Sequence, residues 1–469
     1  MSARSFTYVL ILVAAAAAAA CGGNGVPSIA GNAARRPLQP AYVSSPSPIQ
    51  HVVIMVQENR TFNDFFAAFP GADGTLFANV EANPRCSPPI QKGTIPLREA
   101  NLILNKDLDH KFSAYHEARD KGSMDGFDRI KFGDDSPECT YPYMYTDPSQ
   151  IKPYWDMAAQ YTLAEHMFTT QGSGSFTAHQ DLIAGTTVVE KRRAMVDLPT
   201  CGGTACFWGC DAPVKTHTHL ISQKNRELNI HEFPGPFPCT SQYAVSFPTL
   251  RDLLDAASVS WKYYVPPATV TAGRLFSAFD AIAGVRYGPE WTTNVISPET
   301  QIFSDIQYGQ LANVSWVIPD MKNSDHPGQT TDNGPEWVAS VVDAIGESPY
   351  WNSTAIVIVW DDWGGLYDNS PPQVMDYGGL GFRVPAIIVS PYARAGYVSP
   401  TNYEFGSILK YVENNWNLGT LGTTDQRANS LIDCFDYYQA PIPFQPIVSS
   451  KDKSYFIHQK PSYKPLDDD

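Results

Sequence analysis

Two apolar runs without alternating polar positions predict buried strands. In Thr354–Trp360, TAIVIVW, six of the seven residues are apolar, and most of these are β-branched or aromatic. This pattern is typical of a strand that is buried on both faces. The shorter run His51–Val56, HVVIMV, has the same character. Both runs therefore favour a sheet that is covered on its two sides.

Strand-like and helix-like segments alternate through the rest of the chain. Further strands are expected at Val259–Val265, Val314–Ile318 and Val384–Val389, and helices at His116–Lys121, Pro153–Tyr161, His179–Ala184, Leu250–Ala257, Pro335–Ile345 and Glu404–Trp416. This order predicts an α/β domain whose central sheet is mostly parallel and flanked by helices. We expect this domain at residues 49–445, with an insertion at about 186–245 and a C-terminal tail at 446–469.

Polar side chains follow both apolar runs at the point where each strand is expected to end. Glu58 and Asn59 follow the first run, and Asp361 and Asp362 follow the second, just before Gly364-Gly365. Ligand sites in α/β sheets form beyond the carboxyl ends of strands. If the two strands are neighbours, these side chains make an oxygen-rich site for a divalent cation, which would relieve carboxylate repulsion. A solvated Asp-Asp turn and an acidic first helical turn are the alternatives.

A Gly-Ser run places a candidate nucleophile ahead of a predicted helix. Ser175 stands in Gln171–His179, QGSGSFTAH, where backbone N–H groups and a helix N-terminus would suit attack on an anionic phosphorus centre. A plain loop is the alternative. The G-x-S-x-G pattern of α/β-hydrolases is absent because Thr177 stands two residues after Ser175.

Composition limits the partners of the chain. The 469 residues include 48 acidic and 33 basic ones, for a formal charge of -15, and no block of five or six basic residues occurs. Nucleic acid is therefore not expected as a partner. A content of 43% hydrophobic and 17% charged residues is that of a globular protein.

The N-terminus has the pattern of an export signal. An apolar stretch from Tyr8 to Ala20 follows Arg4 and ends at Cys21, in a sequence that resembles a bacterial lipobox. We expect a lipoprotein-type signal peptide at residues 1–21, a lipid anchor on Cys21, and a flexible tether at 22–48. The protein would then be exported and held at the cell envelope, periplasmic or extracellular. Plain cleavage and release is the alternative.

Seven cysteines remain besides Cys21, and six of them lie between residues 86 and 239. Thiols outside the cytosol tend to pair. We therefore expect three disulfides in that region, in any of fifteen pairings, with Cys434 free and buried. A metal knuckle at Cys201, Cys206 and Cys210 is the alternative, although its spacing fits no common zinc pattern.

Several segments in order resemble the bacterial phosphoesterase family of secreted phospholipases C and an acid phosphatase, within the alkaline-phosphatase-like superfamily. The matching segments span about residues 49 to 440 and are HVVIMVQENRTFNDFF, DLDH, GSMDGF, GSFTAHQDLIAG, DHP, IVWDDWGGLYDN, GLGFRVPAIIVSPYARAGYV and LIDCFDYYQ. The resemblance implies an alkaline-phosphatase-like α/β fold. It also implies hydrolysis of phosphate esters, of the phospholipase C or the acid phosphatase type.

The resemblance also implies roles for particular residues. Glu58, Asn59, Asp361 and Asp362 match the metal ligands of the family, and the metal would be Ca, Mg, Mn or Zn. Ser175 matches the nucleophile, which would attack phosphorus in line and form a phosphoserine that water then hydrolyses. Residues that hold or protonate the phosphate are matched by His110, His326 and Asp325. The expected substrate is a phosphate ester, including phospholipid.

The sequence departs from the family at two positions that commonly carry histidine. Asn369 stands where many members have the histidine of Asp-His, and Phe405 where they have that of Tyr-Asp-His. These losses keep open a ligand-binding surface lipoprotein on an inactive scaffold. A sulfatase is disfavoured because nothing resembles its cysteine-containing maturation motif.

Overall fold

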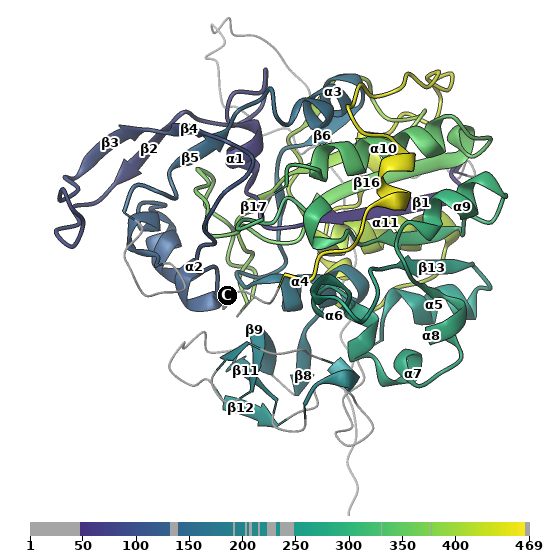
Figure 1. Cartoon of the computed structure of the whole chain (residues 1–469), viewed down its shortest axis with the longest axis horizontal. Coiled ribbons are helices and arrows are strands. Elements are labelled where there is room, and N and C mark those ends of the chain that lie inside the picture. The colour runs from purple at the N-terminus through teal and green to yellow at the C-terminus, as the bar shows by residue number, and fades with distance from the viewer. Residues whose placement is uncertain are drawn as a thin grey trace, which may run out of the picture. The chain divides into compact units, whose positions relative to one another are not determined.

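The computed structural model describes residues 47–131, 139–190, 193–201, 204–205, 209–213, 216–222, 231–234, 248–329, 331–376 and 378–464. Its centre is an eight-stranded sheet (Figure 1). In spatial order the strands are β14 (Val295–Ile296), β13 (Trp261–Tyr264), β15 (Val314–Val317), β1 (His51–Gln57), β16 (Thr354–Trp360), β18 (Ala386–Val389), β6 (Thr162–Ala164) and β19 (Tyr397–Ser399). Only β18 runs antiparallel to its two neighbours, β16 and β6.

The two strands predicted from apolar runs lie side by side at the middle of this sheet. β1 pairs in parallel with β16, from His51 opposite Thr354 to Gln57 opposite Trp360. Every residue of β16 and all but the first of β1 are buried, which agrees with runs that lack polar positions. The expected α/β class with a mostly parallel sheet is therefore confirmed.

Helices pack on the sheet in two groups (Figure 1). One group has α10 in contact with α3, α9 and α12, and the other has α4 in contact with α11 and α5. The helices are α1 (Phe62–Phe66), α2 (Phe112–Arg119), α3 (Lys152–Gln160), α4 (Ser175–Ala184), α5 (Leu250–Ala256), α6 (Thr271–Leu275), α7 (Ala283–Arg286), α8 (Glu290–Thr293), α9 (Gln301–Gln307), α10 (Gly334–Gly346), α11 (Phe405–Trp416) and α12 (Lys453–His458). Within the described ranges, no helix combines the length and the apolar character that crossing a membrane requires.

Four smaller sheets complete the fold. One consists of β8 (Val188–Glu190), β9 (Arg193–Cys201), β10 (Thr204–Ala205), β11 (His217–Ser222) and β12 (His231–Pro234), and we call it the insertion sheet. The others are β17 (Arg383–Val384) with β7 (Met167–Phe168) and β20 (Tyr403–Glu404), β2 (Phe77–Val80) with β3 (Gly93–Pro96), and β4 (Arg98–Ala100) with β5 (Met144–Thr146). Figure 1 shows the insertion sheet near α2 and α4.

Most predicted boundaries differ from the structure by one or two residues, and three elements differ more. The expected strand Val384–Val389 is divided, because Pro385 lacks an N–H and separates β17 from β18, which belong to different sheets. Helix α4 begins at Ser175, four residues before the expected start at His179. Helix α2 begins at Phe112 rather than His116 and ends at Arg119.

Two of the cysteine expectations can be compared with the structure. Cys86 and Cys139 form a disulfide, and Cys434 is free and buried, as expected. Cys210 is also disulfide-bonded. The side chains of Cys201, Cys206 and Cys239 lie outside the described residues, as do the signal peptide and almost all of the tether.

Candidate active site

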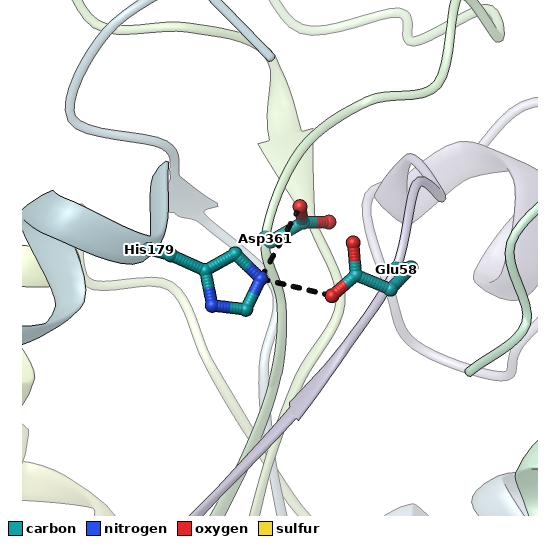
Figure 2. A group of neighbouring side chains, drawn as sticks. All are labelled: Glu58, His179 and Asp361. Carbon is teal, nitrogen blue, oxygen red and sulfur yellow. Dashed lines mark hydrogen bonds and ion pairs between the residues drawn. The ribbon is translucent and has the colours of Figure 1, made fainter. Parts of the chain in front are cut away.

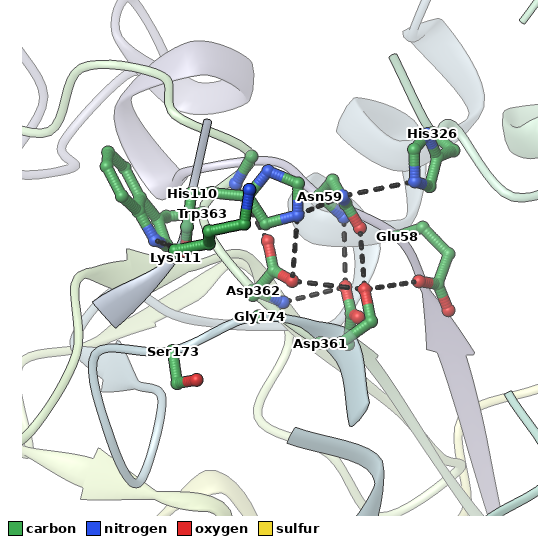
Figure 3. A network of polar contacts seen from close by, with 12 residues as sticks. Glu58, Asn59, His110, Lys111, Ser173, Gly174, His326, Asp361, Asp362 and Trp363 are labelled. Carbon is green, nitrogen blue, oxygen red and sulfur yellow. Dashed lines mark hydrogen bonds and ion pairs between the residues drawn. The ribbon is translucent and has the colours of Figure 1, made fainter. Parts of the chain in front are cut away.

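The ends of β1 and β16 bring four polar side chains together. Glu58 and Asn59 follow β1 directly, and Asp361 and Asp362 follow β16, and all four are fully buried (Figure 3). The backbone N–H of Asn59 donates to Asp361 Oδ1 at 2.9 Å, which ties the two strand ends to each other. The structure therefore brings together the four side chains that were expected from the sequence to converge.

A double-glycine turn allows the chain to leave this cluster. Gly364 has φ +57° and Gly365 has φ +72°, a region that residues with a side chain rarely adopt. A Cβ at Gly364 would lie 2.4 Å from the carbonyl oxygen of Asn59, and one at Gly365 would lie 2.3 Å from Leu108 Cβ. The turn that follows Asp361 and Asp362 consequently needs glycine at both positions.

Ser175 enters the same cluster from helix α4. It is the first residue of the helix, after Gly174 in extended conformation, at the end where the first N–H groups have no acceptor within the helix. Ser175 Oγ lies 3.2 Å from Asp362 Oδ2, 3.3 Å from Glu58 Oε2 and 3.4 Å from Asn59 Oδ1. A hydroxyl surrounded by three acceptor oxygens is placed as one more oxygen ligand of a shared cation.

The Asn59 amide lies between two histidines on one side and two carboxylates on the other. Its nitrogen is 3.1 Å from His110 Nε2 and 3.3 Å from His326 Nε2. The Nδ1 atoms of these rings lie 2.6 Å from the carbonyl oxygens of Leu108 and Pro327. With the amide in this orientation, each ring donates through Nδ1 and accepts the amide N–H at Nε2.

That arrangement turns the Asn59 oxygen toward other acceptors. The oxygen lies 3.2 Å from Asp361 Oδ1 and 3.3 Å from Glu58 Oε2. Rotating the amide would remove this conflict only if both His110 and His326 carried a proton on Nε2 as well. With neutral histidines, the crowded oxygens of Glu58, Asn59 and Asp361 fit the ligand shell of a hard cation.

His179 is a member of the site that the sequence analysis did not find. It lies one helical turn after Ser175, and its Nε2 is 2.9 Å from Glu58 Oε1 and 3.8 Å from Asp361 Oδ2 (Figure 2). Burial lowers the pKa of His179 to about 4, so the ring is neutral near pH 7. The four-residue spacing from Ser175 within a helix is the signal that would have revealed it.

Glu58, His179 and Asp361 form a buried group that could hold a metal ion. Asp361 Oδ2 is buried and has no hydrogen-bond partner. Burial raises the pKa of Asp361 well above its usual range, and the charge of Glu58 adds to this shift. Glu58 and Asp361 each place one carboxylate oxygen near His179 and the other near Asn59. Both carboxylates therefore contact the histidine and the oxygen cluster.

The structure places the carboxylate of Asp325 apart from this cluster. Its Oδ2 accepts hydrogen bonds from Tyr154 Oη at 2.7 Å, Trp360 Nε1 at 3.2 Å and Gln57 Nε2 at 3.4 Å. Burial raises the pKa of Asp325 to about 6. These contacts fix the backbone just before His326, which does reach Asn59. A direct role of Asp325 at the phosphate stays a prediction.

One of the two positions that lack the family's histidines, Asn369, contacts a buried arginine. Asn369 Oδ1 accepts a hydrogen bond from Arg383 at 2.6 Å, and Arg383 Nε donates to Asp368 Oδ1 at 2.9 Å. Phe405 is fully buried at the start of α11. The Arg383 guanidinium, itself buried, lies 4.6 Å from the ring centre of Phe62. This arginine therefore bonds the asparagine at one of the two positions where the resemblance implies histidine.

The fold and the site together define an α/β protein with a buried, cation-suited oxygen cluster beside a helix-terminal serine. A sequence model of the Phosphoesterase family matches residues 49–419, and the chain belongs to this family. The resemblance found in the sequence is thereby confirmed.

Individual relatives are distant. Phospholipase C B of Mycobacterium tuberculosis is 23% identical over 474 residues, which cover 87% of this chain and 82% of that protein. Non-hemolytic phospholipase C of Pseudomonas aeruginosa is 22% identical over 415 residues, 79% of this chain and 54% of that protein. A solved protein in the alkaline phosphatase superfamily from Vibrio parahaemolyticus is similar over 83% of this chain and 73% of its own, with 11% identity and a TM-score of 0.34.

Proposed function

We propose that this chain is a metal-dependent phosphoesterase that uses Ser175 as its nucleophile. The observation that carries the proposal is the position of Ser175 Oγ. It lies at the N-terminus of α4 and 3.2 to 3.4 Å from oxygens of Asp362, Glu58 and Asn59. A hydroxyl at a helix N-terminus beside a cation site is suited to attack an anionic phosphorus centre.

The cation would be held by Glu58, Asn59, Asp361 and Asp362. His179 lies next to two of these ligands, the carboxylates of Glu58 and Asp361. A divalent cation bound there lowers the pKa of the serine hydroxyl and offsets negative charge on the phosphate oxygens. An oxygen-rich set favours Ca, Mg or Mn, and the adjacent imidazole of His179 also suits Zn.

The bond-making and proton-transfer steps would use the protein's own side chains. Ser175 Oγ would give its proton to Asp362 Oδ2, 3.2 Å away, and form a bond to phosphorus while the bond from phosphorus to the leaving oxygen breaks. His110 or His326 would supply the proton that the leaving oxygen takes up from a ring protonated on Nε2 as well as Nδ1, a form in which the Asn59 amide presents its oxygen to the ring. Water then cleaves the bond between Ser175 and phosphorus and restores the hydroxyl.

The names of the relatives support a phosphodiester substrate of the phospholipid kind. Both relatives described above are phospholipases C. We propose that the chain cleaves the ester on the lipid side of the phosphate, as that name describes. Monoester hydrolysis of the acid phosphatase type is the other outcome of the test below. Export and lipid anchoring at Cys21 remain proposals drawn from the first 21 residues.

The test is hydrolysis of p-nitrophenyl phosphate and bis-p-nitrophenyl phosphate by residues 22–469 with added divalent metal. Ser175→Ala should lower kcat by about a thousandfold, the order expected for a lost nucleophile. Ser340→Ala is the matched control, since that buried serine on α10 bonds only the carbonyl of Trp337. Preference for the diester supports the phospholipase C type. If neither ester is cleaved and no metal binds, the proposal fails and a binding lipoprotein becomes the better account.

A further inference from the structure

One aspartate of the insertion sheet contacts both segments that carry the candidate catalytic groups. Asp197 lies on β9, and its Oδ1 accepts a hydrogen bond from the backbone N–H of Phe112 at 2.7 Å. Its own backbone N–H donates to Ser173 Oγ at 2.8 Å. Phe112 follows His110 by two residues, and Ser173 precedes Ser175 by two residues. A single residue therefore joins the two catalytic segments.

The Asp197 contact satisfies a group that the helix itself leaves unpaired. Helix α2 has no side-chain cap from its own N-cap residue, Lys111. The first N–H groups of a helix need an outside acceptor, and a carboxylate is the favoured one there. Asp197 supplies that acceptor from a different part of the chain, so the start of α2 is fixed against the insertion sheet.

The surroundings show that this contact is built into the fold. Asp197 is 8% exposed and Ser173 is 1% exposed. The backbone of Asp197 has φ +62°, a left-handed conformation that costs free energy for residues other than glycine and persists where neighbouring contacts enforce it. Phe112 also packs in a small apolar cluster with Ala194, Val196 and Ile221 of the insertion sheet.

We propose that Asp197 is a positioning residue, which holds the Ser173–Ser175 segment and the His110 segment in register with each other. This inference rests on the proposed function, because it assigns the insertion sheet a part in catalysis. Ser175 Oγ and His110 Nε2 belong to separate segments of the chain, and both lie beside Asn59 and Asp362. A displacement of about 1 Å between such groups lowers kcat by about a hundredfold.

Two substitutions at Asp197 distinguish the effect of losing the side-chain acceptor from the effect of changing the left-handed backbone. Asp197→Asn keeps an acceptor oxygen and tolerates a left-handed backbone, whereas Asp197→Gly tolerates that backbone but lacks any acceptor. Asp211→Asn is the matched control, because Asp211 pairs with Arg286 at 2.8 Å and touches neither catalytic segment. If Asp197→Gly does not fold, Ser173→Ala replaces it by removing the acceptor of the Asp197 N–H.

The experiment measures kcat and KM on both p-nitrophenyl esters, together with amide hydrogen exchange of residues 110–119 and 170–180. Asp197→Gly should lower kcat by about 10- to 100-fold with KM changed less than about threefold. Exchange should become faster in both segments together. Asp197→Asn and Asp211→Asn should stay within about threefold of the parent and keep the parent's exchange.

Unchanged kcat and unchanged exchange in Asp197→Gly would overturn the inference and leave the proposed function standing. A loss of thermal stability with the parent's kcat would also overturn it, since the contact would then be structural alone. If the parent cleaves neither ester, the proposed function fails. Hydrogen exchange then tests by itself whether Asp197 holds the two segments together. Faster exchange in both segments supports the inference, and faster exchange in one or neither refutes it.

Discussion

Replacing Glu58 by glutamine should raise the stability of the metal-free protein and lower the stability that the protein gains from metal. Glu58 is fully buried beside Asp361, whose pKa is raised by burial and by the Glu58 charge. Two unit charges about 4 Å apart repel by roughly 4 kcal/mol at an effective dielectric constant of about 20. Partial protonation of Asp361 relieves part of that repulsion. We therefore expect Glu58→Gln to raise the metal-free free energy of unfolding by about 1 to 3 kcal/mol.

Divalent metal should stabilise the parent more than Glu58→Gln, and so reduce or reverse the difference in the free energy of unfolding between them. At a free concentration of about 100 times Kd, a bound ligand adds about 2.7 kcal/mol to the free energy of unfolding of the parent. Glu58→Gln lacks one ligand charge, so it should gain less than about 1 kcal/mol at the same concentration. Urea unfolding of both proteins, with a chelator and with metal, measures all four free energies.

Glu299→Gln is the control for this comparison. Glu299 is another buried carboxyl group, and burial raises its pKa to about 8, but it lies outside the candidate metal site. It should change the metal-free stability while leaving the metal-dependent gain of the parent intact. An equal metal-dependent gain in Glu58→Gln and the parent would refute the assignment of Glu58 as a ligand. A less stable metal-free Glu58→Gln would refute the repulsion argument.

Three further predictions concern the surroundings of the site. His179→Ala should weaken metal binding by about 10- to 100-fold, measured by isothermal titration calorimetry, because Glu58 loses its 2.9 Å partner; unchanged affinity would contradict this. Gly364→Ala should destabilise the protein by about 1 to 3 kcal/mol or more, because a Cβ would lie 2.4 Å from the backbone carbonyl oxygen of Asn59. Gly93 has open space around it, so Gly93→Ala should leave the free energy of unfolding unchanged in the same urea titration. Glu299 keeps its proton up to about pH 8 in the folded state and only to about 4.5 when unfolded, so stability should fall as pH rises through that window. Glu299→Gln should flatten this fall, and an unchanged pH profile would count against it.

The sheet could be predicted because its central strands carry their burial in the sequence. His51–Val56 and Thr354–Trp360 are apolar at nearly every position, so only a doubly covered strand accommodates them. Their pairing followed as a conditional expectation, and with it the convergence of Glu58 and Asp361. The break at Pro385 was missed because apolar character continues across it, although the strand pairing does not.

The parts of the site that were missed depend on contacts between distant segments. Helix α4 was expected to start too late, because a Gly-Ser run has no apolar periodicity, and His179 was therefore not placed one turn from Ser175. The contacts of Asp325 with Tyr154 join residues far apart in the chain. The role of Asp197 depends in the same way on an insertion whose docking leaves no local pattern.

Rapid acid quench followed by peptide mass spectrometry shows whether Ser175 becomes bonded to phosphorus during turnover. With bis-p-nitrophenyl phosphate and divalent metal, we expect the peptide containing Ser175 to carry a phosphoryl group that retains one p-nitrophenyl ester. Ser175→Ala should show no modified peptide and no burst of p-nitrophenol. Turnover with phosphorus attached to a different residue, or turnover of Ser175→Ala at the parent's rate, would contradict the account.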